Sequence, residues 1–325
     1  METFLHHKLY ISLITSLSAE EALKLQRQTT PDSIRRFNIR DIEQVINRKL
    51  RCSDHDPNWL YQRALAIEEQ ITEHSITVLH ISDEDYPSSL KSIYDPPYLL
   101  YLRGSIPSKV GGVSIIGTRR ATTEGLHQAF KMGASIGLLG IPHYSGLAYG
   151  IDSASHEGAV SVSGSTWGII GSGLLKIYPR SHISLSQRMI DTGGGIISEF
   201  PPDMSPAKWT FPKRNRLISG MCSVLYVIEA PKVSGTMITV DYALDHGREV
   251  CIDANSLITE RSTGTWELAD QGAVVIENFE DLLRALNSDD TIRYTIAKRT
   301  DRKGNPERII RYGSKKYAVW REDAT

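Results

Sequence analysis

The sequence predicts an α/β protein whose mostly parallel sheet carries helices on both faces. Short apolar runs recur through the middle of the chain, most are followed by a turn rich in Gly or Ser, and a helical pattern follows each turn. Repeated strand–turn–helix units favour a parallel sheet, because a parallel connection has to cross over one face of it. The expected strands cover residues 113–116, 142–144, 166–170, 195–198, 224–228, 249–252 and 273–276.

Two flanking segments lack this pattern. Residues 1–75 show helical periodicity and a capping box at Ser18-Ala-Glu-Glu21, and we expect Asp41 to cap a further helix. Near the other end, apolar and polar residues alternate around a polar turn at 301–306, which predicts a short basic β-hairpin. We therefore expect three parts, namely a helical N-terminal domain at 1–75, a core at 76–288 and a basic tail at 289–325.

Composition limits the functions that are open to the chain. It has 325 residues, of which 40% are hydrophobic and 23% charged, so a chain that is disordered throughout is excluded. Residues 291–325 hold ten Lys or Arg and four acids, so this tail carries +6 and the rest of the chain −7. Any nucleic-acid site must therefore be a local patch. The tail fits either a solvated edge ribbon or an accessory contact with nucleic acid or a partner.

The cysteines and the first residues bear on the compartment. Cys52, Cys222 and Cys251 are far apart and odd in number, which excludes a disulfide framework and a Cys-rich zinc site and fits a reducing cytosol. The first residues do not have the pattern of a signal peptide, and no apolar run approaches the ~20 residues of a membrane helix. We expect a cytoplasmic protein without a membrane contact.

The first two turns suggest an anion site at the carboxyl end of the sheet. Gly117, Thr118 and Arg119 follow the first core strand. An arginine beside a helix N-terminus suits a phosphate, and a purely structural turn is the alternative. Ser145-Gly146 forms the second turn, and Asp152 lies in the helix that follows. No nucleophile elbow is present, so we interpret Asp152 as a cap or network carboxylate and not as part of a hydrolytic triad.

The segment 198–220 interleaves cations with aromatic residues. Cations contact phosphates and aromatic faces stack on bases, so this combination is typical of single-stranded nucleic-acid sites. The alternative is a loop packed by its own aromatics with solvated charges. We expect its prolines to hold it extended and a helix to begin near Asn215. The residues concerned are Lys208, Trp209, Phe211, Lys213, Arg214 and Arg216.

A further turn follows the strand 224–228. The small residues Ser234-Gly235-Thr236 open a helix there, and such a helix start suits an anion. Glu229, at the end of the same strand, is expected to accept hydrogen bonds from Arg119 or Arg216. The ten histidines are scattered without metal-ligating spacing, so we expect neither a metal nor a cofactor.

These segments, in this order, resemble the DNA-processing protein A family, also called DprA or Smf. The resemblance covers roughly residues 78–276, and several of its motifs are individually unusual. They are IIGTRRATTEG (115–125), SGLAYGIDSASHEGAV (145–160), GIIGSGLLKIYPRSH (168–182), IISEFPP (196–202), FPKRNRLISG (211–220) and VIEAPKVSGTMIT (227–239).

The resemblance implies an extended Rossmann-like domain that is not an enzyme. Such proteins bind single-stranded DNA in a positive pocket, form homodimers, protect incoming DNA and load the RecA recombinase onto it, including during natural transformation. The family usually has Arg where Tyr149 stands, so a ring able to stack on a base replaces one cation. Carried over by motif, the DNA-binding residues would be Gly117, Thr118, Arg119, Ser145, Gly146, Tyr149, Phe211, Lys213, Arg214, Asn215, Arg216, Ser234 and Gly235.

Two other functions remain open, because a fold alone does not choose among them. The first is a sensor or enzyme for a nucleotide-like small molecule that uses the same pocket, with Asp152, Glu199 or Glu229 as its catalytic carboxylate. The second is an interaction protein whose pocket no longer binds a ligand. Stabilisation by a mononucleotide but not by an oligonucleotide would favour the small-molecule function.

Overall fold

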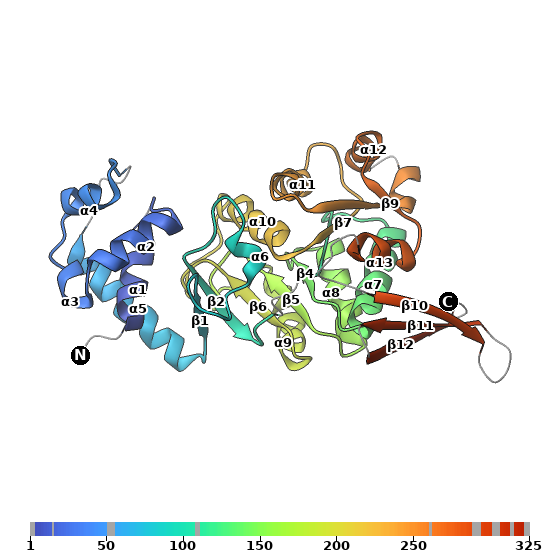
Figure 1. Ribbon diagram of the computed structural model, residues 1–325, viewed down its shortest axis with the longest axis horizontal. Helices are drawn as coiled ribbons and strands as arrows, with labels where there is room; N and C mark the ends of the chain where they lie inside the picture. The colour runs from blue at the N-terminus through green and yellow to red at the C-terminus, as the bar shows by residue number, and fades with distance from the viewer. Residues whose placement is uncertain are drawn as a thin grey trace.

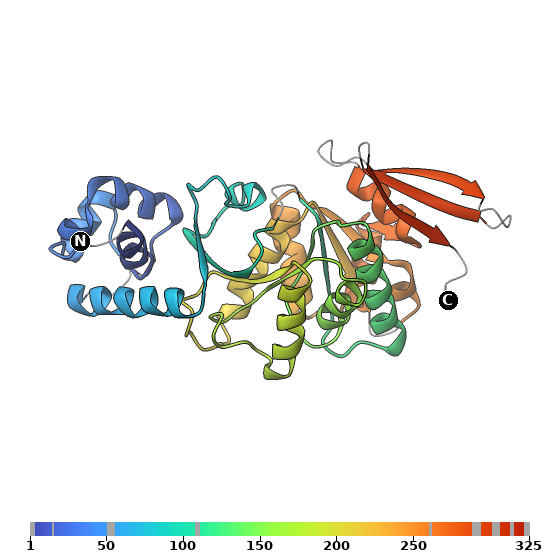
Figure 2. The same ribbon diagram turned by 90° about the horizontal axis from the view of Figure 1, so that it is seen from below.

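The computed structural model describes residues 4–14, 16–50, 56–107, 111–259, 262–287, 294–300, 306–312 and 315–321. Helices lie at one end of an elongated molecule, a nine-stranded sheet with its covering helices fills the middle, and a three-stranded sheet lies at the other end (Figures 1 and 2). No helix within these ranges is both long and apolar enough to span a bilayer. Cys222 and Cys251 are buried and unpaired, and Cys52 is outside the described residues.

The N-terminal end is helical, as predicted. The predicted capping box is present, since Ser18 Oγ accepts from the backbone N–H of Glu21 at 3.2 Å and the Glu21 carboxylate accepts from that of Ser18 at 2.8 Å. The role expected for Asp41 was wrong. Asn38 caps that helix, and Asp41, three residues later, accepts from the Asn38 N–H at 2.8 Å. The helices are α1 (Phe4–Ser12), α2 (Ala19–Gln28), α3 (Pro31–Ile34), α4 (Ile39–Ile46) and α5 (Pro57–Glu73).

The central sheet is mostly parallel, as the strand–turn–helix pattern predicted. Its order is β1-β2-β6-β5-β4-β3-β7-β8-β9; β2 pairs antiparallel with both β1 and β6, and every other neighbouring pair is parallel. All seven expected strands are among them. The strands are β1 (Thr77–His80), β2 (Leu99–Gly104), β3 (Val113–Gly117), β4 (His143–Ser145), β5 (Thr166–Ile169), β6 (Gly195–Ser198), β7 (Val224–Ile228), β8 (Glu249–Asp253) and β9 (Val274–Ile276).

Helices cover both faces of this sheet. Successive strand residues point to opposite faces, so Ile115 and Tyr226 pack with one layer while Ile116 and Val227 pack with the other. The first layer contains α7 (Thr123–Leu138), α8 (Ile151–Ser161), α9 (Ile183–Asp191) and α13 (Phe279–Asn287). The second contains α6 (Ser88–Lys91), α10 (Thr210–Met221), α11 (Gly235–Asp245) and α12 (Thr263–Asp270), and two 3-10 turns lie at Arg180–His182 and Ala254–Ile258.

The order of the strands creates a crevice. β3 and β7 are neighbours, but β3 leads through α7 to β4 on one side and β7 leads through α11 to β8 on the other. Two adjacent parallel strands whose connections diverge leave an opening at their carboxyl ends, where ligands of open α/β sheets bind. The turns that begin at Gly117 and Glu229 meet at this point.

The C-terminal end forms a separate antiparallel sheet of β10 (Tyr294–Thr300), β11 (Pro306–Tyr312) and β12 (Lys315–Arg321). β10 and β11 are the two strands of the predicted hairpin, and β12 adds a third strand against β11. Of the expected polar turn, 301–306, residues 301–305 lie outside the described residues, and Pro306 begins β11.

Candidate functional site

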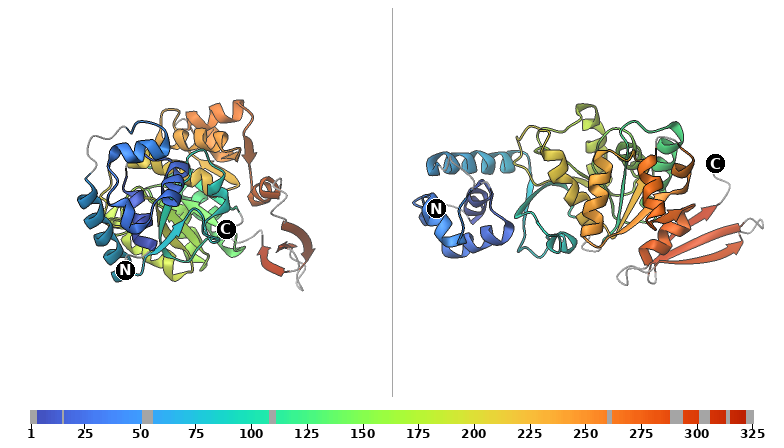
Figure 3. Two further views of the ribbon diagram at one scale, coloured as in Figure 1. Left: turned by 60° about the vertical axis from the view of Figure 1, so that its left-hand side comes forward. Right: turned by 90° about the horizontal axis from the view of Figure 1, so that it is seen from above.

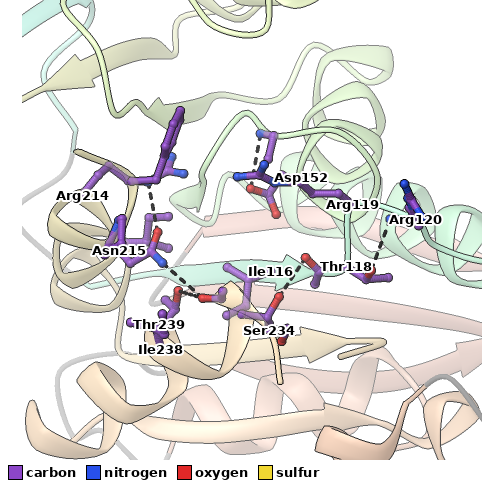
Figure 4. Close-up of a pocket in the computed structure, with 17 residues that line it drawn as sticks. Ile116, Thr118, Arg119, Arg120, Asp152, Arg214, Asn215, Ser234, Ile238 and Thr239 are labelled. Carbon is purple, nitrogen blue, oxygen red and sulfur yellow. Dashed lines mark hydrogen bonds between the residues drawn. The ribbon is translucent and has the colours of Figure 1, made fainter. Parts of the chain in front are cut away.

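A cavity of about 480 Å³ occupies the crevice between β3 and β7 (Figure 4). It is formed by the turns after these strands, the segment before and at the start of α8, and α10. Its lining includes three arginines and one carboxylate, so it is a positive site. The lining residues are Ile116, Gly117, Thr118, Arg119, Arg120, Ala148, Asp152, Phe211, Pro212, Arg214, Asn215, Ile218, Ser234, Gly235, Thr236, Ile238 and Thr239.

Arg214 is the buried cation of this cavity. It is 4% exposed, and its Nη1 donates to the carbonyl oxygen of Gly146 at 2.6 Å and to that of Ile169. Asp152 lies against the same glycine and accepts from the N–H groups of Gly146 at 3.1 Å and Ala148 at 3.4 Å. Burial lowers the pKa of Arg214 to about 10 and raises the pKa of Asp152, and the attraction between the two charges opposes both shifts. Arg214 therefore remains a fixed positive charge at neutral pH.

Arg119 stands at the mouth of the cavity among aromatic rings. Its guanidinium carbon lies 5.6 Å from the centre of the Phe211 ring, and the centre of the Tyr178 ring lies 5.7 Å from that of Phe211. Tyr149 is 48% exposed and is held edge-on against His182 at 5.0 Å. Arg119, Phe211, Tyr149 and Tyr178 line a small adjoining cavity. Exposed rings beside a cation suit stacking against a planar, negatively charged ligand.

The first turn of α11 provides a second anion-attracting group. Ser234 is its N-cap residue, yet no side chain caps the turn and the buried Ser234 Oγ has no hydrogen-bond partner in the described structure. A Cβ on Gly235 would meet nothing within 4 Å. Asn215 Nδ2 donates to the Gly235 carbonyl at 3.2 Å and Thr236 Oγ1 donates to the Gly117 carbonyl at 3.0 Å, so this turn is fixed to α10 and β3. Uncapped amides with the positive end of a helix dipole favour an anion here.

The N-terminus of α7, in contrast, already holds an anion. The Glu229 carboxylate accepts from the Thr122 N–H at 2.8 Å and from its hydroxyl, and Thr122 Oγ1 caps the Gly125 N–H at 3.0 Å. The partners expected for Glu229, Arg119 and Arg216, were therefore wrong. Glu229 directly follows β7 and has a φ of 51°, in the left-handed region. Its carboxylate accepts its hydrogen bonds from Thr122, at the start of α7.

The cations of FPKRNR separate in space. α10 begins at Thr210, not near Asn215 as expected, so these residues are helical. Residues two apart on a helix are about 200° apart around its axis, and Arg216 accordingly points away from the cavity that Arg214 lines. Arg216 is 5% exposed and pairs with Glu199 at 2.5 Å and Asp95 at 3.5 Å, and Lys213 Nζ is 3.3 Å from the same Glu199 oxygen.

The structure thus places the thirteen sequence-predicted residues in three groups. Eight line the main cavity, Gly146 and Tyr149 line the adjoining one, and Ser145, Lys213 and Arg216 line neither. Ser145 is buried and its Oγ donates to the Ile115 carbonyl at 2.6 Å, so it joins β4 to β3. Among lining residues that sequence reasoning did not select, Arg120 and Tyr178 stand out. Both are within the quoted motifs, which was the available signal.

Among the described residues, no group of three His, Cys, Asp or Glu side chains lies close enough together to hold a metal ion. The three carboxylates considered for catalysis all hold structural partners. Asp152 accepts backbone N–H groups, Glu199 pairs with Arg216 and Lys213, and Glu229 caps α7.

The fold and the cavity define an extended Rossmann-like protein with a cationic, aromatic-flanked anion site at its switch point. The family model for DNA recombination-mediator protein A matches residues 77–287, and the chain belongs to this family. DNA processing protein DprA of Bacillus subtilis (strain 168) is 38% identical over 225 residues, 69% of this chain and 75% of that protein. Protein Smf of Borreliella burgdorferi is 28% identical over 86% of this chain and 88% of its own length.

Two solved structures resemble much of this fold. The X-ray structure of DprA from Streptococcus pneumoniae matches 87% of this chain and 98% of its own, with a TM-score of 0.69 and 28% identity. A structure of DNA processing protein A from Helicobacter pylori, which concerns the single-stranded DNA binding mode of that protein, matches 66% of this chain and 96% of its own, with a TM-score of 0.58 and 28% identity.

Proposed function

We propose that this chain binds single-stranded DNA in the cavity between β3 and β7. Backbone phosphates lie against Arg119, Arg214 and the first turn of α11, and bases stack on Tyr149 or Phe211. The observation that carries the proposal is the convergence of two arginines and an uncapped helix start beside exposed aromatic rings. Most contacts are then to phosphate, so sequence preference is weak.

In this function the protein is a recombination mediator and not an enzyme. It protects incoming single-stranded DNA and loads RecA onto it during recombination or natural transformation, as a homodimer in the cytoplasm. Support comes from the family to which the chain belongs and from its likeness to the H. pylori protein, whose structure concerns single-stranded DNA binding. The structural partners of Asp152, Glu199 and Glu229 disfavour the alternative of a nucleotide-processing enzyme. We assign DNA binding to the core domain, 76–288, with 1–75 and 289–325 as separate domains.

The test is fluorescence anisotropy of a labelled single-stranded oligonucleotide over a salt series, with duplex as competitor. Arg119→Ala is the informative variant, because this side chain is exposed and we expect the fold to tolerate its loss. We expect weaker binding of every sequence and a salt slope that is smaller in magnitude by about 0.7, the value for one phosphate contact on a single strand.

Lys24→Ala is the matched control, because Lys24 is an exposed cation on α2, outside the cavity. Equal binding by Arg119→Ala and the unmodified protein would refute the site. A thermal-shift comparison covers the alternative function: strong stabilisation by a mononucleotide, with none by the oligonucleotide, would replace DNA binding by small-molecule binding.

A further inference from the structure

An ion pair joins the N-terminal helices to one turn of the core. α5 extends from the helical domain to the edge of the core (Figure 3). Arg63 of this helix donates from Nη1 to Asp203 Oδ2 at 2.9 Å and from Nη2 to Asp203 Oδ1, so the pair is bidentate. Gln70, two helical turns further on, donates to Asp203 Oδ2 at 3.2 Å. The N-terminal domain therefore binds this carboxylate through three hydrogen bonds.

The pair fixes geometry more than it adds stability. Its side chains are 25% exposed at Arg63 and 31% exposed at Asp203, and a partly exposed ion pair contributes little to the free energy of unfolding. A bidentate arginine, however, holds a carboxylate in one orientation. The hydrogen bonds from Arg63 lower the pKa of Asp203, so the carboxylate stays charged at neutral pH. The contact is thus suited to positioning the turn that carries Asp203.

That turn, residues 201–204, is bonded to a second stretch of the core backbone. The Pro202 carbonyl accepts from the Leu175 N–H at 2.8 Å. The Met204 carbonyl accepts from the Gly173 N–H, also at 2.8 Å. The two backbones are in direct contact, because a Cβ on Gly173 would stand 2.1 Å and 2.2 Å from two carbonyl oxygens of the turn. Movement of the turn therefore moves the segment that begins at Gly173.

This segment, 173–178, ends at an aromatic ring of the candidate site. Tyr178 is 46% exposed and lines the small cavity beside the main one. Its ring centre is 5.7 Å from that of Phe211, which lines both cavities. Leu174 is buried in an apolar cluster that also includes residues of α1, α2 and α5, and Ile177 packs against the same cluster. The N-terminal helices and this segment thus share one apolar cluster in addition to the ion pair.

We propose that Arg63 is a positioning residue for the DNA site, because it holds Tyr178, through Asp203 and the 173–178 segment, where a base can stack on the ring. The inference rests on the proposed function and adds the N-terminal domain to it. No described residue of α1–α5 lines either cavity, so any effect of this domain on DNA binding is indirect. A contact that only stabilises the fold is the alternative.

The test is fluorescence anisotropy of a labelled single-stranded oligonucleotide with the full chain. Arg63→Met keeps an aliphatic side chain but removes both hydrogen bonds, and it should weaken binding on the order of threefold. Asp203→Asn removes the charge of the carboxylate and should give a loss of similar size. The double variant should lose no more than either single variant, because all three break the same contact. Tyr178→Ala should weaken binding about fivefold or more, as expected for one stacked base.

A double-mutant cycle separates positioning from a general loss of stability. If Arg63 acts through the ring, Arg63→Met should change the affinity little in the Tyr178→Ala background. A purely structural role predicts the same loss in the presence and in the absence of the ring. Tyr178→Phe keeps the ring, so this variant should bind normally and remain sensitive to Arg63→Met.

Arg48→Met is the matched control. Arg48 makes the same kind of bidentate pair with Glu21, but within the N-terminal domain, and its loss should leave the DNA affinity unchanged. Unchanged affinity in Arg63→Met, an equal loss in Arg48→Met, or an undiminished loss in the Tyr178→Ala background would overturn the proposal. Arg119→Ala, measured alongside, reports on the cavity. If it alone weakens binding, the cavity is the DNA site and only the positioning role is refuted; if it binds normally, the site fails and this inference fails with it.

Discussion

Replacing Gly146 by Ala tests whether the Arg214–Asp152 cluster sets the shape of the cavity. A Cβ there would stand 2.6 Å from Asp152 Oδ2 and 2.7 Å from Arg214 Nη1, whereas ordinary contacts to a Cβ are 3.4–4 Å. Neither group is free to move, because Arg214 is bonded to two carbonyls and Asp152 to two backbone N–H groups. Overpacking of this kind costs about 1–3 kcal/mol. Displacement of Arg214 should also weaken DNA binding.

Two measurements are made on the same protein preparation: the midpoint of thermal unfolding, and DNA binding by the folded protein in fluorescence anisotropy. A loss of 1 kcal/mol lowers the midpoint by about 2–4 °C in a domain of this size. Gly235→Ala is the matched control, since it changes another cavity glycine whose Cβ would meet nothing within 4 Å. At the start of α11 alanine should be neutral or stabilise by up to about 1 kcal/mol. A melting midpoint for Gly146→Ala equal to that of the unmodified protein would refute the reasoning.

Three further predictions follow from individual groups. Arg216→Met should lower stability by about 3 kcal/mol in denaturant unfolding, because it removes a buried cation and leaves Glu199, whose side chain is 13% exposed, without its main partner. The cavity of the folded protein should keep its DNA affinity, and unchanged stability would contradict the prediction. Burial lowers the pKa of His143 from 6.5 to about 3 and that of His156 well below 6.5. Below about pH 6.5 the two histidines are therefore protonated in the unfolded chain but stay neutral in the folded one. Stability should therefore fall as the pH drops from about 6.5 toward 3, by up to about 1.4 kcal/mol per pH unit for each histidine, and a flat melting profile would count against it. Tyr149→Ala should weaken binding of an oligonucleotide by about 1–3 kcal/mol in anisotropy if a base stacks on this ring, whereas Tyr149→Phe should bind normally; equal losses in both would point to the hydroxyl instead.

The fold was predictable to the extent that it depends on neighbouring residues. β3 and β7 are mostly apolar runs that are buried on both faces. Such runs are typical of parallel strands, so both strands could be predicted without knowing which strands lie beside them. The capping box at Ser18 is likewise a contact over three residues. The turns at Gly117 and Ser234 had to lie at one edge of the sheet, because carboxyl ends of parallel strands share that edge.

The site was predictable only in part, because spacing along a chain does not state which elements face each other. Arg214 and Arg216 look equivalent in the sequence, yet the helical twist of α10 directs one to the cavity and the other to Glu199. Glu229 found its partner at Thr122, more than a hundred residues away, and not in an arginine. These contacts depend on how α10 and α7 pack on the sheet.

The sequence by itself therefore determined the strands, the turns and the family, because these depend on local patterns and on motifs in a fixed order. Only the tertiary structure decided which cations share a cavity and which carboxylates are already paired. The physical reason is that charge acts through space. Its effect at a site depends on the separation of groups that the chain brings together from distant positions.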